Sequence, residues 1–223
     1  MKVLAVSDKV LNRLYRGGIA HELGPIDLVV GCGDLPYYYL KFLASALDTR
    51  VFFVHGNHDS GAQYTYDGQQ LKQIPGGFDL HGRFAWERKV LFAGLEGSMW
   101  YRPNAAYMYH ESQMFWEVMR LVPRLMWNRA RYGRALDVLV THSPPFGIHD
   151  EADVAHTGFK AFLMLMRRFR PKYLLHGHIH THRPDVTWVT QYYGTRIINV
   201  YPYRVLDLEA PPAVQAVVGK RVG

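Results

Sequence analysis

Five short apolar runs in this chain each lead into residues that can bind a metal ion, and this repeated pattern constrains the fold most. The runs lie at residues 2–6, 27–30, 51–54, 137–141 and 172–175. Their bulky and β-branched side chains are typical of strands buried on both faces. Helix-compatible segments at 11–23 and 36–47 separate the first three runs. This β-α-β-α-β order predicts a largely parallel sheet with helices on its faces.

The later segments predict further strands. A hairpin is expected at 83–86 and 89–94, where it could start a second sheet layer. A helix is expected at about 158–169. The runs at 186–191, 195–200 and 204–208 alternate or are apolar around turn residues, which predicts an antiparallel end to the sheet system.

Polar residues follow each of the five apolar runs. Because ligands gather at the carboxyl ends of parallel strands, we expect these side chains to meet at one edge of the fold. Carboxylate, amide and imidazole groups suit hard-to-borderline divalent metals, and a ligand set without cysteine argues against a structural zinc finger. The sequence therefore predicts a metal site formed by Asp8, Asp34, Asn57, His142, His178 and His180.

The third run ends in a glycine turn that presents three polar residues in succession. Gly56 permits a sharp turn, which lifts Asn57, His58 and Asp59 off the sheet edge. By itself such a stretch is more often an ordinary turn. Its coincidence with four other polar strand ends supports a functional interpretation.

Length and composition favour one folded domain over residues 1–223. Hydrophobic residues make up 48% of the chain and charged residues 20%, which excludes a disordered protein. The N-terminal apolar run is too short for a signal peptide, and no run is long enough to span a membrane, so we expect a cytoplasmic location. The lone Cys32 lies in an apolar stretch, which predicts a buried thiol.

Residues 99–135 are rich in Met, Arg and aromatic residues and predict a helical insertion. An apolar stripe of Phe115, Met119, Val122 and Met126 has helical spacing, and Pro123 interrupts it, which favours a helix pair packed on the core. The alternative is a cap that contacts a substrate or a membrane surface. The net charge of +7 suits an anionic partner, but no Lys/Arg tract indicates a nucleic-acid tail.

Four blocks of the chain resemble the calcineurin-like metallophosphoesterases. They are Gly33-Asp34, Gly56-Asn57-His58-Asp59, Thr141-His142 and Gly177-His178-Ile179-His180, in that order. The resemblance implies an α/β fold, a four-layer α/β/β/α sandwich of two mixed β-sheets flanked by helices. It also implies hydrolysis of a phosphate ester, either a phosphodiester or a phosphomonoester, by a metal-bound hydroxide.

The same resemblance assigns roles to the site residues. Asp34 would bridge two divalent metals, with Asp8 and His180 on one ion and Asn57, His142 and His178 on the other. His58 would donate a proton to the leaving group or stabilise the transition state, and Asp59 would orient its ring. Manganese is the expected metal, and iron, zinc and nickel also suit these ligands.

One block departs from the family pattern. The first block of the family usually reads Asp, any residue, His, whereas this chain has Asp8-Lys9-Val10. Valine cannot coordinate a metal, so we expect weaker binding of the ion held by Asp8, Asp34 and His180. Water, Asn12 or His182 are the candidate replacements for the missing ligand.

The expected partner is a small phosphorylated substrate. Tyr37 could stack on a base or sugar of it, and Arg183 could hold a phosphate. Two alternatives stay open: a binding scaffold of the same fold with weak or lost catalysis, which Val10 favours, and a nuclease, which the basic charge favours. The sequence does not determine the oligomeric state.

Overall fold

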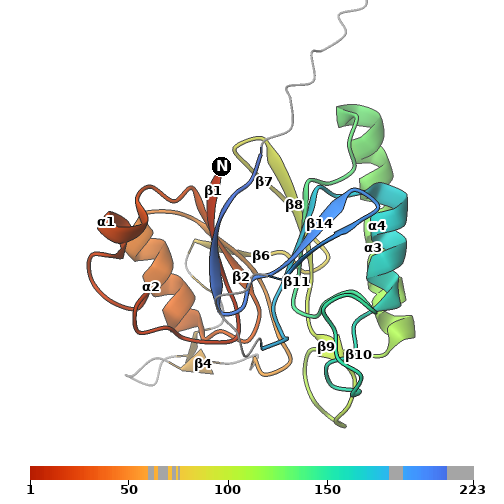
Figure 1. Cartoon of the computed structure of the whole chain (residues 1–223), viewed down its shortest axis with the longest axis horizontal. Coiled ribbons are helices and arrows are strands. Elements are labelled where there is room, and N and C mark those ends of the chain that lie inside the picture. The colour runs from red at the N-terminus through yellow and green to blue at the C-terminus, as the bar shows by residue number, and fades with distance from the viewer. Residues whose placement is uncertain (60–62, 65–69, 72–73, 75, 181–187, 210–223) are drawn as a thin grey trace, which may run out of the picture.

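Two β-sheets pack face to face at the centre of the protein, and helices cover their outer faces (Figure 1). The computed structural model describes residues 1–59, 63–64, 70–71, 74, 76–180 and 188–209. The first sheet has the order β15-β1-β2-β3-β6, with β1 Lys2–Val6, β2 Leu28–Cys32, β3 Val51–Val54, β6 Gly77–Asp79 and β15 Tyr203–Asp207. The second has the order β13-β14-β12-β11-β8-β7, with β7 Phe84–Glu87, β8 Val90–Leu95, β11 Val138–Thr141, β12 Tyr173–His176, β13 Val189–Tyr192 and β14 Thr195–Asn199.

Each sheet has its own helices. Helices α1 (Ile19–Leu23) and α2 (Tyr37–Leu47) lie on the first sheet, and α3 (Glu111–Tyr132) and α4 (Lys160–Phe169) lie on the second (Figure 1). Two small pairs of strands complete the described elements: β4 Gln63–Tyr64 with β5 Gln70–Leu71, and β9 Ser98–Met99 with β10 Met108–Tyr109. The predicted four-layer α/β/β/α architecture is confirmed.

The strand directions bring the polar residues to one edge. In the first sheet β1, β2, β3 and β6 run parallel, and β15 returns antiparallel to β1. In the second sheet β8, β11, β12 and β14 run parallel, with β7 and β13 antiparallel at its edges. The carboxyl ends of the central strands are therefore the place where loops from both sheets can meet.

Three apolar clusters hold the layers together. The central cluster lies between the sheets and includes Val30 and Phe52 from the first sheet and Phe92 and Val140 from the second. A second cluster lies under α3 and α4, and a third under α1 and α2. Cys32 is buried in the central cluster, and burial raises the pKa of its thiol well above the ordinary value, as expected for a structural cysteine.

The predicted helix pair at 99–135 is wrong, because Glu111–Tyr132 is one helix that continues through Pro123. The predicted apolar stripe is also wrong at two of its four positions, since Phe115 and Met126 are exposed. The buried side chains are instead Met114, Val118, Leu121, Leu125 and Asn128. Their spacing places Pro123 on the exposed side of the helix, away from the packed face.

The predicted helix at 11–23 is also shorter than expected. Residues 11–18 form turns, and only Ile19–Leu23 is helical. Gly18 precedes the helix with φ of 85°, a conformation that glycine adopts without steric cost. The adjacent pair Gly17-Gly18 therefore breaks the pattern that predicted a longer helix.

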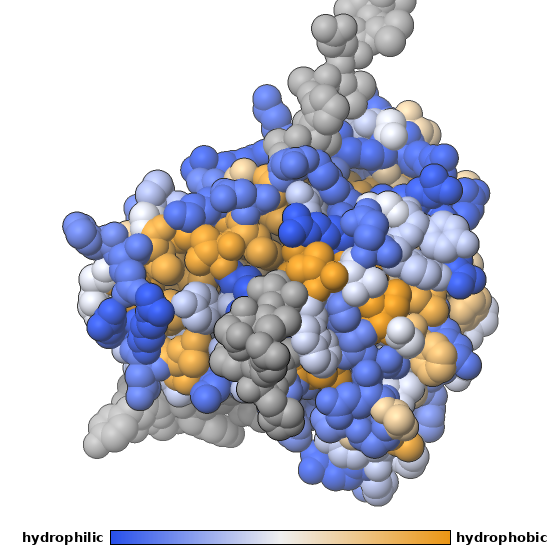
Figure 2. All heavy atoms as spheres, viewed as in Figure 1, coloured by the Kyte–Doolittle hydropathy of each residue, from blue (hydrophilic) through white to orange (hydrophobic). Residues whose placement is uncertain are grey.

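The surface shown in Figure 2 mixes polar and apolar residues. Hydrophobic residues form separate patches among hydrophilic ones on this face. Within the part of the chain that the structure describes, no helix is both long and apolar enough to cross a membrane.

Candidate metal centre

The predicted ligands lie at the seam between the two sheets. Asp8, Asp34 and Asn57 follow strands of the first sheet, and His142, His178 and His180 follow strands of the second. Hydrogen bonds join the two groups across the seam. The Nδ1–H of His142 donates to the carbonyl of Cys32 at 2.8 Å, and the backbone N–H of His178 donates to Asp8 Oδ2 at 3.0 Å.

Asp34, His142 and His178 form the tightest group, which we call the ligand trio. One possible ligand atom from each lies within 4.8 Å of those of the other two. His142 Nε2 is 3.4 Å from Asp34 Oδ2 and 3.0 Å from Asn57 Oδ1. The amide nitrogen of Asn57 donates to the hydroxyl of Tyr101 at 3.2 Å, so its oxygen faces the trio.

The histidines of the trio are oriented by backbone carbonyls. Because Nδ1 of His142 donates to Cys32, its Nε2 is the nitrogen that faces Asp34. His178 has the opposite arrangement, since its Nε2–H donates to the carbonyl of Ala155 at 2.8 Å and leaves Nδ1 as the ligand atom. Such hydrogen bonds fix the tautomer and the ring direction of metal-binding histidines.

The second group of predicted ligands is less complete. Asp8 Oδ2 accepts hydrogen bonds from the Ser7 hydroxyl and the His178 backbone. Its Oδ1 is buried and has no hydrogen-bond partner among the described residues, and His180 Nε2 lies 3.4 Å from it. A buried carboxylate oxygen of this kind costs free energy unless a cation or donor satisfies it, so the donor set fits a metal ion.

Val10 contributes nothing to this second group. Its side chain packs against the apolar cluster under α1 and α2. Of the two candidate replacements, Asn12 is exposed and His182 lies outside the described residues. Among the described residues, this half of the centre therefore offers three candidate ligands, namely Asp8, Asp34 and His180.

Three of the ligand residues have left-handed backbone conformations. The φ angles are 63° for Asp8, 55° for Asp34 and 66° for His178. Outside glycine this conformation costs roughly 1 to 3 kcal/mol per residue and is concentrated at functional sites. Three such residues at one edge indicate that the fold holds the backbone in a locally unfavourable conformation, which orients these side chains.

The trio holds a strong internal ion pair. Burial would raise the pKa of Asp34, but the charge of His142 and its hydrogen bond outweigh this and lower that pKa to about 2. Burial likewise opposes the charged form of His142, yet the Asp34 carboxylate raises the pKa of His142 to about 9. A proton on His142 thus balances the carboxylate, and a divalent cation could replace that proton.

Asp59 supports the turn that carries Asn57. Its Oδ2 accepts hydrogen bonds from the backbone N–H groups of Gly56 at 2.7 Å and Asp34 at 3.0 Å. Burial raises the pKa of Asp59 to about 6, and the nearby Asp34 carboxylate adds to the effect. These contacts place Asp59 beneath the turn, and its predicted catalytic role beside His58 stays a prediction.

His58 lies at the open side of the centre. His58 is exposed, and its backbone N–H donates to Asp34 Oδ1 at 2.8 Å. This bond ties the position of the His58 backbone to a ligand of the trio. The backbone of His58 is therefore next to the ligand trio, and its exposed side chain is accessible from solvent.

Tyr37 does not fit the predicted role in substrate binding. It is only 5% exposed, and its hydroxyl lies 2.7 Å from Nε2 of His55. Nδ1 of the same ring is 3.0 Å from Glu96 Oε2, and the ring of Tyr107 stacks on it. Tyr37 therefore belongs to a buried polar network behind the turn. The other predicted substrate residue, Arg183, lies outside the described residues.

Several groups that shape the centre are not among the residues predicted from the sequence. Tyr101 holds Asn57, Ala155 holds His178, and the ring of Tyr201 stacks on His180 at 4.5 Å between centroids. These contacts join segments far apart in the chain, and a backbone carbonyl such as that of Ala155 has no sequence signature.

Close packing leaves no room for a side chain at Gly33, which precedes the candidate ligand Asp34. This gives a testable prediction. A Cβ added to Gly33, where φ is 92°, would lie 2.4 Å from His142 Nδ1. We expect Gly33→Ala to lower the free energy of unfolding by about 2 to 4 kcal/mol and to weaken metal binding. Thermal melts and metal titration measure both effects.

Gly194 supplies the matched control for this substitution. It has a φ of 90°, but an added Cβ meets no atom within 4 Å. Gly194→Ala should therefore show only the backbone strain, about 1 kcal/mol. Equal losses in the two variants would show that the contact with His142 is unimportant.

Comparisons with solved structures found several proteins of similar fold. A solved structure of TT1561 from Thermus thermophilus superposes with a TM-score of 0.60 at 14% identity, covering 89% of this chain and 88% of that one. GAP50 of Plasmodium, described as the anchor in the inner membrane complex, gives a TM-score of 0.49 at 13% identity, with 89% and 70% covered. Vps29 from Entamoeba histolytica gives 0.39 at 13% identity, with 89% and 73% covered.

At 14% identity, the TT1561 structure shows similarity of fold alone. No curated protein sequence matches it. The family model for calcineurin-like phosphoesterases, however, matches residues 6–182, a span that contains all six candidate ligands and His58. The chain therefore belongs to the calcineurin-like phosphoesterase family.

Proposed function

We propose that this protein hydrolyses a phosphodiester or phosphomonoester of a small substrate, with divalent metal ions bound at the seam between the sheets. The ligand trio carries the proposal, because its carboxylate and two imidazoles converge within 4.8 Å and backbone carbonyls orient both rings. Family membership supports metal-dependent phosphoester hydrolysis in general. Manganese is the metal we propose, and the cytoplasm the location.

Bound divalent ions supply two effects in such a site: they lower the pKa of a water molecule and neutralise charge on the phosphoryl oxygens. The protein supplies the rest. Asp34, Asn57, His142 and His178 would hold one ion, and Asp8, Asp34 and His180 the other. His58, exposed beside Asp34, donates a proton to the leaving oxygen as the ester bond breaks.

A second function is favoured by one observation. Val10 packs against the apolar cluster under α1 and α2 where the family usually has a ligand, so an ion at Asp8 would have fewer ligands from the described residues. A weakly metallated binding scaffold would have this defect and no turnover. The count of bound ions and the activity decide between the two functions.

The test is hydrolysis of p-nitrophenyl phosphate and bis(p-nitrophenyl) phosphate by metal-free protein supplied with manganese. We expect turnover that requires manganese, is abolished by EDTA and saturates with two bound ions. No hydrolysis of either ester with manganese, iron, zinc or nickel would contradict the proposed enzyme and leave the scaffold. Binding of a single ion at saturation, with full activity, would contradict only the role of Asp8 and His180.

A further inference from the structure

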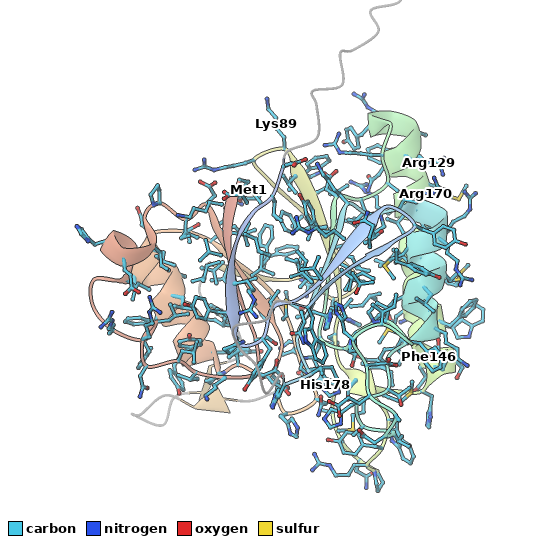
Figure 3. All side chains as sticks on the ribbon, in the orientation of Figure 1. Met1, Lys89, Arg129, Phe146, Arg170 and His178 are labelled. Atoms are coloured by element: carbon cyan, nitrogen blue, oxygen red, sulfur yellow. The ribbon has the colours of Figure 1, made fainter. Side chains whose placement is uncertain are left out.

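Five arginines surround one hollow on the side of the protein away from the metal centre. The hollow, which we call the arginine cleft, has a volume of about 450 Å³ and is lined by Arg129, Arg134, Arg167, Arg168 and Arg170. Arg129 lies in the last turn of α3, and Arg170 directly follows α4. Figure 3 shows these two residues at the upper ends of the helices, while His178 lies at the opposite edge.

The arginines of the cleft have few negative partners. Arg134 pairs with Asp137, with 2.8 Å between Nε and Oδ1, and Arg167 donates to the hydroxyl of Tyr192 at 2.5 Å. No carboxylate among the described residues pairs with Arg129, Arg168 or Arg170. None of the residues that line the cleft is acidic.

Helix dipoles alone do not account for this charge. The carboxyl ends of α3 and α4 each present roughly half a negative charge, and cations there are ordinarily stabilising. Together with Asp137 this amounts to about two negative charges against five arginines, which leaves an excess of roughly three positive charges. Like charges confined in one hollow repel each other, so an anion bound among them would gain free energy.

We propose that the arginine cleft is a binding site for an anion that carries two or more phosphate groups. Guanidinium groups form paired hydrogen bonds with phosphate oxygens, and several around one hollow suit a multiply charged ligand better than a single phosphate. The volume of the cleft lies in the range of small-molecule sites. The phosphates can come from a soluble polyphosphorylated molecule or from a phosphorylated lipid headgroup.

Tripolyphosphate is the soluble probe. It is titrated into metal-free protein in EDTA at physiological salt, so that binding at the metal centre does not contribute. We expect binding that weakens by at least about tenfold in the Arg129→Gln/Arg168→Gln variant, which loses charge-assisted hydrogen bonds. Inorganic phosphate should bind more weakly than tripolyphosphate.

A matched variant controls for the loss of net charge. Arg50 and Arg120 are exposed, lie outside the cleft and pair with Glu87 and Glu117. The Arg50→Gln/Arg120→Gln variant removes the same two charges and should bind tripolyphosphate as the wild type does. Thermal melts without ligand confirm that both variants fold.

Lipid vesicles distinguish the two sources of phosphate. Sedimentation is compared for vesicles of phosphatidylcholine alone and vesicles that also contain phosphatidylinositol bisphosphate. Binding to the second kind that is lost only in Arg129→Gln/Arg168→Gln supports the proposal with a lipid source, and binding of tripolyphosphate alone supports it with a soluble source. Binding of neither probe, or equal loss in both double variants, would overturn the proposal.

Discussion

Replacing Asp34 by Asn should lower phosphoesterase activity by about a hundredfold or more, because this residue belongs to both predicted ligand groups. Asn has no charge with which to balance a cation, and it removes the buried ion pair with His142. Metal titration by calorimetry should show that affinity falls for both ions. The assay is hydrolysis of bis(p-nitrophenyl) phosphate with manganese.

The same substitution should also lower stability in the metal-free protein. The pKa of Asp34 is lowered to about 2 in the folded protein. Its ionised carboxylate therefore stabilises the fold at pH values above the ordinary pKa of an aspartate. This stabilisation is lost as the pH falls toward 2. We expect a loss of about 2 kcal/mol at neutral pH. Asp207→Asn is the control, because it removes the same charge from an exposed side chain in β15. Normal activity in Asp34→Asn would refute its role as a ligand.

His58→Ala should lower kcat by about 10²- to 10⁴-fold for esters whose leaving group is an alkoxide. An alkoxide needs a proton as the bond to phosphorus breaks, whereas p-nitrophenolate is stable without one. The loss should therefore be clearly smaller for p-nitrophenyl substrates. A comparison of the two substrate classes separates proton donation from metal binding, which His58→Ala should leave intact.

His21→Ala is the matched control for this prediction, since His21 is exposed on α1. Its activity should equal that of the wild type with both substrate classes. An equal loss in His58→Ala for alkyl and nitrophenyl esters would indicate that His58 stabilises charge and donates no proton. Unchanged activity would exclude both roles.

Local patterns were sufficient to predict the central strands and the candidate ligands at their carboxyl ends, whereas β6 lies in a segment whose sequence indicated only loop and turns. A buried parallel strand needs an apolar run, and a ligand at its carboxyl end must follow that run directly, so Asn57 and His142 were identifiable from sequence. The glycines beside them have a physical reason as well, because Gly56 leaves no room for a Cβ next to Asp34. The extent of a single domain over residues 1–223 stays a prediction.

The rest depended on tertiary contacts. Helix α3 has large apolar residues on both its buried and its exposed sides, so periodicity selected Phe115 and Met126 where the fold buries Met114 and Leu125. Tyr37 lies three residues after Asp34, yet α2 turns its ring into the core toward His55. The orientation of His178 depends on a carbonyl in another loop, which no local pattern encodes.

The return of β15 to pair with β1 has a consequence for synthesis on the ribosome. β1 precedes every other described strand in the sequence, and its partner β15 follows all of them. Until β15 is made, one edge of the first sheet has no partner, and such edges invite pairing between chains. Asp8 must likewise wait for His180. During synthesis the first sheet therefore gains its fifth strand, and Asp8 meets the candidate ligand His180, only after the strands between them have been made.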